Sequence, residues 1–231
     1  MRKLLVAHRG DCSRAHENTL EAFADAITNG ADMIELDVRQ TRDGEIVVHH
    51  DEGIADVLLR DVDYNQVQQL AAPYSYRVPT LAEVAALTRG RIQLDVELKE
   101  PIGAATLDIL FKGGFASNDF VVTSFDAASL RPVIDDPRAV RTGLLTEETA
   151  DVLTEFRLSG TAFLAPSLAI VDTTLLSRAE AHSIPLLPWT VNDPTDIERL
   201  LKAPAVTGVI TDRLAAAIER RASGAIGPIL L

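Results

Sequence analysis

The sequence predicts a TIM (β/α)₈ barrel of the α/β class, formed as one domain by residues 1–231. Short β-rich runs alternate with helical patterns along the whole chain, and eight such runs can be counted. Eight parallel strands close a barrel, and barrels of this length commonly form one domain. The alternative, an open doubly wound sheet, would favour a glycine-rich phosphate loop after its first strand, where Gly10 stands without companions.

The barrel strands are expected in runs that are rich in β-branched and other apolar residues. In chain order they are Lys3–Ala7, Asp32–Arg39, Arg91–Leu98, Phe120–Ser124, Arg141–Leu145, Ala162–Leu164, Pro185–Val191 and Gly208–Thr211. A further strand, Gly44–His49, is predicted to pair with the second strand as a hairpin, because Arg42-Asp43-Gly44 has Asp-Gly turn chemistry.

Helix signals lie between these strands. Asn18 and Glu21 are placed like a capping box ahead of an apolar periodicity from Leu20 to Ile27, and Gly30 is expected to end that helix. Further helix starts are predicted at Thr80 with Glu83, ending near Gly90, at Asp193 before Pro194, and at Asp212.

Composition excludes several classes of function. The net charge of −12 and the pI of about 4.8 predict a surface that repels nucleic acid and anionic membranes. The single Cys12 cannot form a disulfide within the chain. No apolar stretch approaches the ~18 residues of a membrane span, and the first residues are too short for a signal peptide. We therefore expect a cytoplasmic protein whose anionic ligands bind a local positive site.

Unusual polar residues stand where the predicted strands end. These runs are His8-Arg9-Gly10, Glu35-Leu36-Asp37, His49-His50-Asp51 and Asp95-Val96-Glu97-Leu98-Lys99, with Trp189 on the seventh strand. Because the carboxyl ends of barrel strands meet at one mouth, which carries the active site in TIM barrels, we expect these side chains to gather there.

Side-chain alternation places Glu35 and Asp37 on one face of their strand, and Asp95, Glu97 and Lys99 on one face of the next. Carboxylates that point into a barrel are costly unless a cation neutralises them. An all-oxygen cluster suits Mg²⁺ or Ca²⁺ better than zinc, and Mn²⁺ is a further candidate. A single E-x-D on a strand is more often a salt bridge, so the hypothesis depends on the coincidence of carboxylates, histidines, arginine and lysine. His16, His49 and His182 are interpreted as structural.

A long pattern of short motifs includes these residues. In order it contains His8-Arg9-Gly10, Glu17-Asn18-Thr19, Ile34-Glu35-Leu36-Asp37-Val38, Asp43-Gly44, His50-Asp51, Pro79-Thr80-Leu81, Glu97-Leu98-Lys99, Ser124-Phe125, Trp189-Thr190-Val191-Asn192 and Thr211-Asp212. Order and spacing resemble those of the glycerophosphodiester phosphodiesterases over essentially the whole chain.

The resemblance implies a TIM barrel that hydrolyses glycerophosphodiesters to glycerol 3-phosphate and an alcohol with one divalent cation. Carried over by position, it implies metal ligands at Glu35, Asp37 and Glu97 and an acid–base pair at His8 and His50. It further implies phosphate contacts from Arg9 and Lys99. Trp189 is expected to pack against the glycerol, and Glu17 is a possible supporting residue. The expected partner is a small glycerophosphodiester, with no nucleic acid.

Three departures from the family pattern stand out, of which the one at His16 is expected to alter only its loop and the other two concern the substrate side. His16 stands where the family usually has proline before E-N-T, and the run after His50-Asp51 differs from the family's usual continuation. Only 28 residues separate His50 from Pro79, which predicts an open leaving-group side.

Two other functions remain open at this point. One is a phospholipase D-type enzyme that acts on lysophospholipids, and the other is a non-catalytic barrel that binds phosphorylated metabolites. The presence of both His8 and His50 argues against pure binding, which needs no acid–base pair. The sequence leaves the alcohol, the metal, the order of acid and base, the choice between water attack and a cyclic phosphate, and the oligomeric state unassigned.

Overall fold

Seven parallel strands follow one another in the computed structural model, which describes residues 2–148 and 152–224. Their order in the sheet is β10-β1-β2-β6-β7-β8-β9. The strands are β1 (Leu4–His8), β2 (Met33–Gln40), β6 (Gln93–Leu98), β7 (Phe120–Ser124), β8 (Arg141–Thr146), β9 (Phe163–Pro166) and β10 (Gly208–Thr211). All neighbouring pairs along this path are parallel, which the alternation of strands and helices predicts.

The segment 185–191 closes the ring between β9 and β10. Leu186 pairs in parallel with Leu164 on one side and with Val206 on the other, and Trp189 pairs with Ser167. These are isolated bridges and not a regular strand. Pro185 and Pro188 explain the irregularity, because proline has no N–H to donate to a ladder. The eight predicted barrel strands therefore all take part, and the TIM barrel prediction is confirmed.

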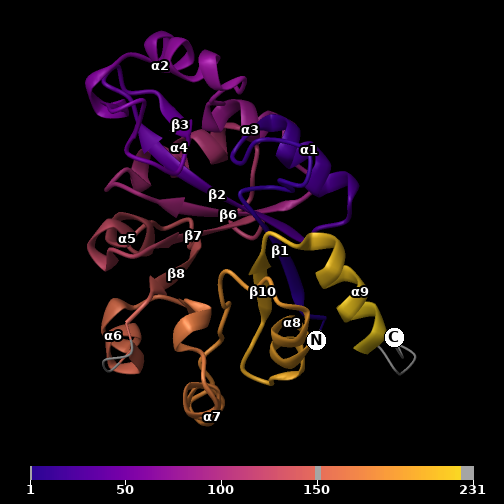
Figure 1. The fold of residues 1–231 in the computed structure, drawn as a ribbon. Coiled ribbons are helices and arrows are strands. Elements are labelled where there is room, and N and C mark those ends of the chain that lie inside the picture. Colours follow the sequence, from indigo (N-terminus) through magenta and orange to yellow (C-terminus); the bar gives the residue numbers. More distant parts are fainter. Residues whose placement is uncertain (1, 149–151, 225–231) are drawn as a thin grey trace.

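Helices surround the barrel (Figure 1). They are α1 (Leu20–Thr28), α2 (Tyr64–Ala71), α3 (Leu81–Thr88), α4 (Gly103–Lys112), α5 (Ala127–Ile134), α6 (Val152–Ser159), α7 (Thr173–Ala181), α8 (Pro194–Lys202) and α9 (Leu214–Gly224). Within the described residues, no helix is long and apolar enough to cross a membrane.

Of the four predicted helix caps, those of α3 and α8 are present as expected, the cap of α1 is a different residue, and the Asp212 side chain has other partners. Thr80 and Glu83 form a capping box on α3, and Asp193 caps α8 ahead of Pro194. The cap of α1, however, is Thr19 and not Asn18, because the Thr19 side chain accepts the Ala22 N–H. Asn18 has a positive φ of 56° and turns its amide elsewhere, into the barrel mouth.

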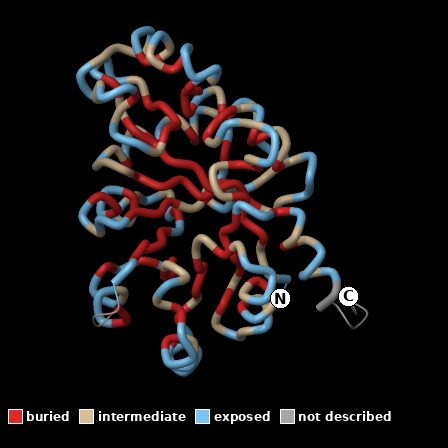
Figure 2. The backbone as a smooth tube through the Cα atoms, viewed as in Figure 1, coloured by how far each residue is buried: buried red, intermediate tan, exposed pale blue. Residues whose placement is uncertain are grey.

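The strands separate two apolar layers. Val6, Met33 and Ile210 belong to a cluster inside the barrel, whereas Ile34 and Leu36 belong to the large core between sheet and helices. Figure 2 shows the strands as the most continuously buried part of the chain. Since Met33 points inward and Ile34 outward, alternation carries Glu35 and Asp37 inward as well.

A small unit lies between β3 (Ile46–Val48), which pairs antiparallel with β2, and α3. It contains the hairpin β4 (Gly53–Ile54) and β5 (Val57–Leu58), then α2, and has its own apolar cluster around Val47, Leu59 and Val67. The sequence did not indicate α2, whose apolar pattern is limited to a few positions within eight residues. The predicted hairpin strand Gly44–His49 is confirmed as the shorter β3.

Candidate functional site

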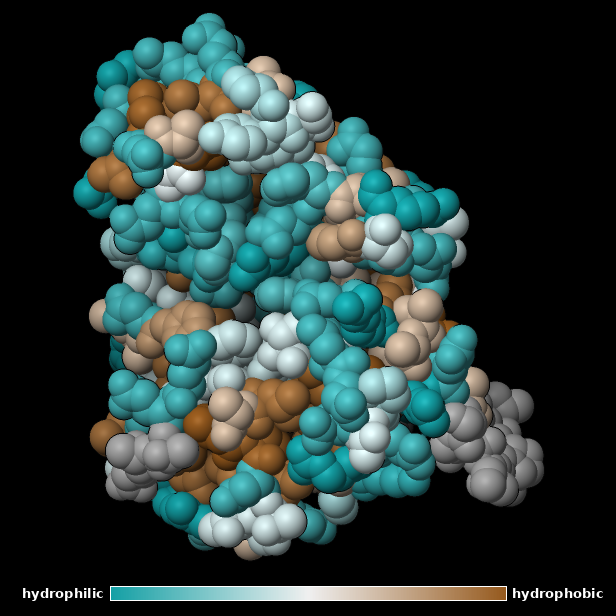
Figure 3. All heavy atoms as spheres, viewed as in Figure 1, coloured by the Kyte–Doolittle hydropathy of each residue, from teal (hydrophilic) through white to brown (hydrophobic). Residues whose placement is uncertain are grey.

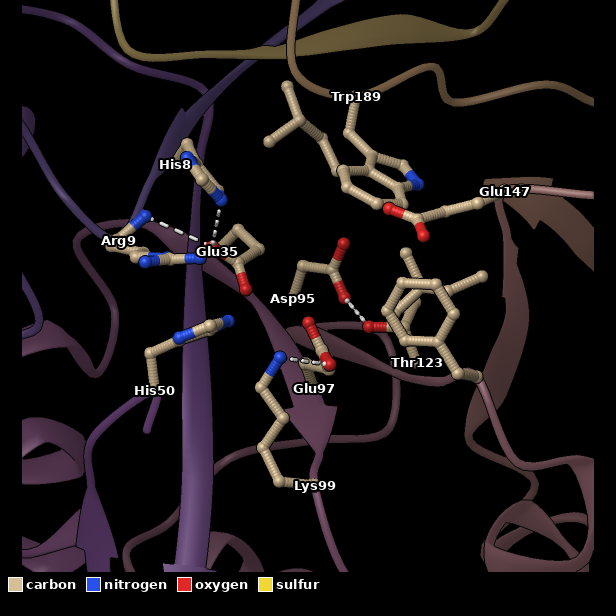
Figure 4. Close-up of a pocket in the computed structure, with 13 residues that line it drawn as sticks. His8, Arg9, Glu35, His50, Asp95, Glu97, Lys99, Thr123, Glu147 and Trp189 are labelled. Atoms are coloured by element: carbon tan, nitrogen blue, oxygen red, sulfur yellow. Dashed lines mark hydrogen bonds and ion pairs between the residues drawn. The ribbon is translucent and has the colours of Figure 1, made fainter. Parts of the chain in front are cut away.

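A pocket of about 140 Å³ opens at the carboxyl ends of the strands (Figure 4). Seven of the nine predicted site residues line it: His8, Arg9, Glu35, His50, Glu97, Lys99 and Trp189. Asp37 is buried next to them, and Glu17 lines a neighbouring pocket. Strand register explains the grouping, because His8 pairs with Glu35 on β2, and Glu35 and Asp37 pair with Asp95 and Glu97 on β6.

Glu35, Asp37 and Glu97 form a buried acidic cluster. One carboxylate oxygen from each lies within 4.8 Å of the other two, and the residues are 4%, 1% and 7% exposed. Asp95 lies beside them, fully buried, and accepts a hydrogen bond of 2.8 Å from the Thr123 hydroxyl. Four carboxyl groups inside a barrel require compensation by protons or cations.

The pKa values of these carboxyl groups reflect the need for compensating charge. Burial, with repulsion from Asp37 and Glu97, raises the pKa of Glu35 well above its ordinary value. Burial raises the pKa of Asp95 to about 7, and burial with repulsion from Asp37 raises that of Glu97 to about 7. Burial also opposes ionisation of Asp37, but Lys99 and Arg9 outweigh it and lower the pKa of that carboxyl.

Several oxygens in the cluster are suited to a cation. Within the part of the chain that the structure describes, Asp95 Oδ2 is buried without a hydrogen-bond partner, and Asp37 Oδ1 and Glu97 Oε1 are buried against the Lys99 ammonium group. Buried carboxylate oxygens on neighbouring inward positions, more numerous than the cationic side chains beside them, are the donor set of a hard divalent ion. The residues present therefore fit a site for Mg²⁺, Ca²⁺ or Mn²⁺.

Two basic side chains flank the acidic cluster. Lys99 Nζ lies 3.0 Å from Asp37 Oδ1 and 2.5 Å from Glu97 Oε1. Arg9 Nε lies 3.3 Å from Asp37 Oδ2, and its Nη1 lies 2.8 Å from Glu17 Oε1. The Arg9 backbone N–H donates to Glu35 at 3.0 Å, so the loop after β1 is attached directly to the cluster.

Asn18 completes the support of Asp37. Its amide donates to Asp37 Oδ2 at 2.8 Å, and both residues are buried. We expected Asn18 to cap a helix, so sequence reasoning missed this contact. The sequence contained a hint of it. Thr19, the third residue of the motif Glu17-Asn18-Thr19, can cap the helix by itself, which leaves Asn18 for another role.

Each predicted catalytic histidine has its Nδ1 close to a carboxylate. His8 Nδ1 lies 2.7 Å from Asp212 Oδ1, and His50 Nδ1 lies 2.8 Å from Asp51 Oδ1. His8 Nε2 lies 3.9 Å from Glu35 Oε2. Because Nδ1 is engaged in both rings, Nε2 is the nitrogen that is available to a ligand in the pocket.

The carboxylate beside His8 is itself positioned. The Asn192 amide donates to Asp212 Oδ2 at 2.7 Å, and the Asp212 backbone N–H donates to Asn192 Oδ1 at 2.9 Å. Asp212 was predicted as a helix cap, but its carboxylate accepts from His8 and Asn192. Both motifs, Trp189–Asn192 and Thr211-Asp212, were identified in the sequence, but the hydrogen bonds between Asn192 and Asp212 were not predicted.

The loop that carries His50 is fixed by an arginine. Arg39 Nε donates to the His50 carbonyl at 2.8 Å, and Arg39 Nη1 lies 3.2 Å from Glu100 Oε1. Arg39 is only 9% exposed, so this pair acts inside the protein.

Trp189 lies across the pocket from His50 (Figure 4). Its Nε1 donates to the Ala165 carbonyl at 2.8 Å, and its ring packs edge-on against Phe125 at 5.4 Å between centroids. Together with Leu145 and Ile210 these rings make an apolar wall. Figure 4 shows His8, Arg9 and His50 on one side of Glu35, and Trp189, Glu147 and Thr123 on the other.

Comparison with known proteins gives one consistent family. The model of the glycerophosphoryl diester phosphodiesterase family matches residues 8–216. A protein of Caldanaerobacter subterraneus subsp. tengcongensis described as a glycerophosphodiester phosphodiesterase is 31% identical, over 92% of this chain and 95% of its own length.

Solved structures agree with this match. A glycerophosphodiester phosphodiesterase from Thermotoga maritima superposes with a TM-score of 0.79 at 27% identity, covering 95% of this chain and 98% of that one. A phosphodiesterase from Oleispira antarctica, solved with its product sn-glycerol-3-phosphate, superposes with a TM-score of 0.83 at 22% identity, covering 94% and 96%. The second likeness concerns the fold alone.

Proposed function

The chain belongs to the glycerophosphoryl diester phosphodiesterase family, and on that basis we propose how its residues hydrolyse a glycerophosphodiester to glycerol 3-phosphate and an alcohol. Membership makes the protein an enzyme, and the alternative of a non-catalytic barrel is set aside. The observation that supports the mechanism best is the pairing of one buried acidic cluster with two histidines at the same mouth. We further propose that residues 1–231 form one domain, which should unfold in one cooperative transition.

Glu35, Asp37 and Glu97 would hold one divalent cation, Mg²⁺ or Ca²⁺, with Mn²⁺ as a further candidate. Bound there, the cation would neutralise negative charge on the non-bridging oxygens of the phosphodiester as that charge shifts in the transition state. The close approach of these three buried carboxylates supports this assignment.

Arg9 and Lys99 would contact the phosphate. Both are held against the acidic cluster, at the pocket wall, by ion pairs with Asp37. Each has more N–H groups than carboxylate partners, so each would keep a donor for the phosphate oxygens. Glu17 would keep Arg9 in place through its contact of 2.8 Å.

His8 and His50 would transfer the protons. One ring, as neutral imidazole, accepts a proton from the attacking oxygen at Nε2. The other, as imidazolium, donates one from Nε2 to the leaving oxygen. Asp212 and Asp51 fix Nδ1–H in each ring, so that Nε2 faces the pocket in both.

Trp189 would pack against the glycerol unit on the apolar side of the pocket. The Oleispira antarctica neighbour, which binds a glycerol phosphate product, supports a glycerol phosphate site in this fold. The phosphate then lies between Trp189 and the two histidines, and the alcohol leaves on the side of Arg9 and His50.

A panel of glycerophosphodiesters tests the proposal, with glycerol 3-phosphate measured by a coupled enzyme and with Mg²⁺, Mn²⁺, Ca²⁺ or EDTA present. Release of glycerol 3-phosphate that depends on the ion supports it. Lysophosphatidylcholine, included in the panel with choline release as its readout, separates this activity from that of a phospholipase D-type enzyme, because its hydrolysis yields lysophosphatidate and choline. Turnover of the lysolipid alone would contradict the proposal.

A further inference from the structure

A second pocket, of about 470 Å³, lies beside the catalytic one. Its walls include the residues His16, Glu17, His49, Asp51, Tyr74 and Tyr76. The last two come from the segment between α2 and α3, in the short connection that was expected to leave the leaving-group side open. That connection instead supplies an aromatic wall.

The two pockets meet along two pairs of residues. Arg9 lines the catalytic pocket and contacts Glu17 of the second at 2.8 Å. His50 lines the catalytic pocket and its Nδ1 lies 2.8 Å from Asp51 of the second. Arg9 and His50 lie across Glu35 from Trp189 in Figure 4. A diester whose glycerol packs on Trp189 would therefore extend its other arm toward this second pocket.

Aromatic rings form one side of the second pocket. The Tyr76 ring stacks on His16 at 3.9 Å between centroids, with 10° between the ring planes. His49 lies 6.3 Å from Tyr76 and nearly parallel to it, and Tyr74 lies 6.5 Å away and tilted. Tyr74 is 57% exposed, so its ring contacts solvent and is not part of the hydrophobic core.

The charged residues that line this pocket are acidic. Glu17 and Asp51 are its charged side chains, and no lysine or arginine lines it within the described residues. Figure 3 shows an apolar patch beside α2, with hydrophilic residues around it. Burial raises the pKa of the Tyr76 hydroxyl, and the negative charges of Asp51 and Glu17 raise it further.

One buried polar atom in the pocket wall has no partner. His49 is 9% exposed, and its Nε2 makes no hydrogen bond within the part of the chain that is described. Burial lowers the pKa of His49, so the ring is neutral near pH 7. A neutral ring adds no positive charge to the pocket wall, so this side of the pocket does not repel a cation.

We propose that the second pocket binds the alcohol part of the substrate and selects a cationic alkylammonium alcohol. Two tyrosine rings with two carboxylates are the recognised surroundings of a quaternary ammonium group, which is attracted to ring faces and to negative charge. The proposal rests on the function proposed above, because it assigns the leaving group of that reaction.

The test compares two diesters of equal shape and different charge. They are glycerophosphocholine and the 3,3-dimethylbutyl ester of glycerol phosphate, in which a carbon replaces the charged nitrogen. Initial rates of glycerol 3-phosphate release by the full chain give kcat/KM for each. We expect about a tenfold preference for the choline ester, as an ammonium group against aromatic rings gains affinity of that order.

The double variant Tyr74→Leu and Tyr76→Leu should bring this preference close to one. It should lower kcat/KM for the choline ester more than for the neutral ester, because only the ammonium group gains from the negative ring faces. Tyr64→Phe, which changes the third tyrosine of the chain within the same unit but outside the pocket, is the matched control and should keep the preference.

Equal kcat/KM values for the two esters in the unaltered protein would overturn the proposal and leave the proposed function intact. An unchanged preference in the double variant would overturn it too. Hydrolysis of neither ester would refute the proposed function itself, so the two failures are distinguishable.

Discussion

His8 Nδ1 lies 2.7 Å from Asp212 Oδ1, although 204 positions separate the two residues in the sequence. The contact joins the first barrel strand to the loop after the last one, across the seam at which β1 pairs with β10. Burial of the pair is partial, with side-chain exposures of 18% for His8 and 43% for Asp212. This carboxylate orients the ring whose Nε2 faces the acidic cluster.

Asp212→Asn tests that orientation. The amide keeps the size of the side chain but removes the charge that favours Nδ1–H, so we expect kcat to fall by about 10- to 100-fold, less than the loss of the ring itself. KM for the diester should change little. The measurement is kcat as a function of pH, and an unchanged kcat across the profile would show that Asp212 does not position His8.

Removal of either catalytic histidine should have a larger effect. His8→Ala and His50→Ala are each expected to lower kcat by ~10²–10⁴-fold, the usual contribution of one proton-transfer group. His49→Ala is the matched control, because His49 precedes His50 in the chain but does not line the catalytic pocket. Equal losses in the His49 and His50 variants would contradict the assignment.

Lys99→Ala should separate phosphate binding from metal binding. Lys99 is paired with Asp37 and Glu97, and a protonated amine cannot ligate a metal. We expect a higher KM or a lower kcat for the diester, with the affinity for the divalent ion retained. Calorimetric titration of the ion into the variant measures the second quantity, and loss of ion binding would exclude the proposed role.

The metal-free protein should lose stability as the pH rises through neutrality. Asp95 and Glu97 have folded-state pKa values of about 7, above their unfolded values of ~4, so the folded state holds protons that the unfolded state has released. Their contribution is complete below about pH 4 and is lost between about pH 4 and 7. In EDTA, the melting temperature should therefore be lower at pH 7.5 than at pH 5.5.

Two controls accompany the melting experiment. Asp95→Asn removes one of these carboxyls while its amide oxygen can still accept from Thr123, so the difference between the two pH values should shrink. A divalent ion should raise the melting temperature more at pH 7.5, where the carboxyls are ionised, than at pH 5.5. A melting temperature in EDTA that rises from pH 5.5 to 7.5 would contradict this account.

The barrel and most of the site could be predicted from the sequence because both depend on local patterns. Alternation along β2 and β6 places Glu35, Asp37 and Glu97 inward, and the strand ends bring His8 and Lys99 to the same mouth. These positions follow once the strands are identified, since parallel barrel strands share one carboxyl end.

The parts that the sequence did not predict depend on contacts between distant segments. Asp212 and Asn192 meet only when the seventh and eighth strand ends adjoin, and each has an equally good local role as a cap or turn residue. The pocket around Tyr76 depends on how the unit after β3 packs. That packing could not be predicted, because the sequence of this unit contains few apolar residues.

The central claim is that Glu35, Asp37 and Glu97 hold the ion on which diester hydrolysis depends. Measuring ion binding and turnover on the same protein samples tests it most directly. Metal-free protein and its Glu35→Gln variant would each be titrated with Mg²⁺, Mn²⁺ and Ca²⁺ by calorimetry and then assayed for glycerol 3-phosphate release. We predict one ion per chain in the unaltered protein, activity that EDTA abolishes and the ion restores, and both weaker binding and loss of turnover in the variant. Full activity in EDTA, or full activity of Glu35→Gln, would contradict the account.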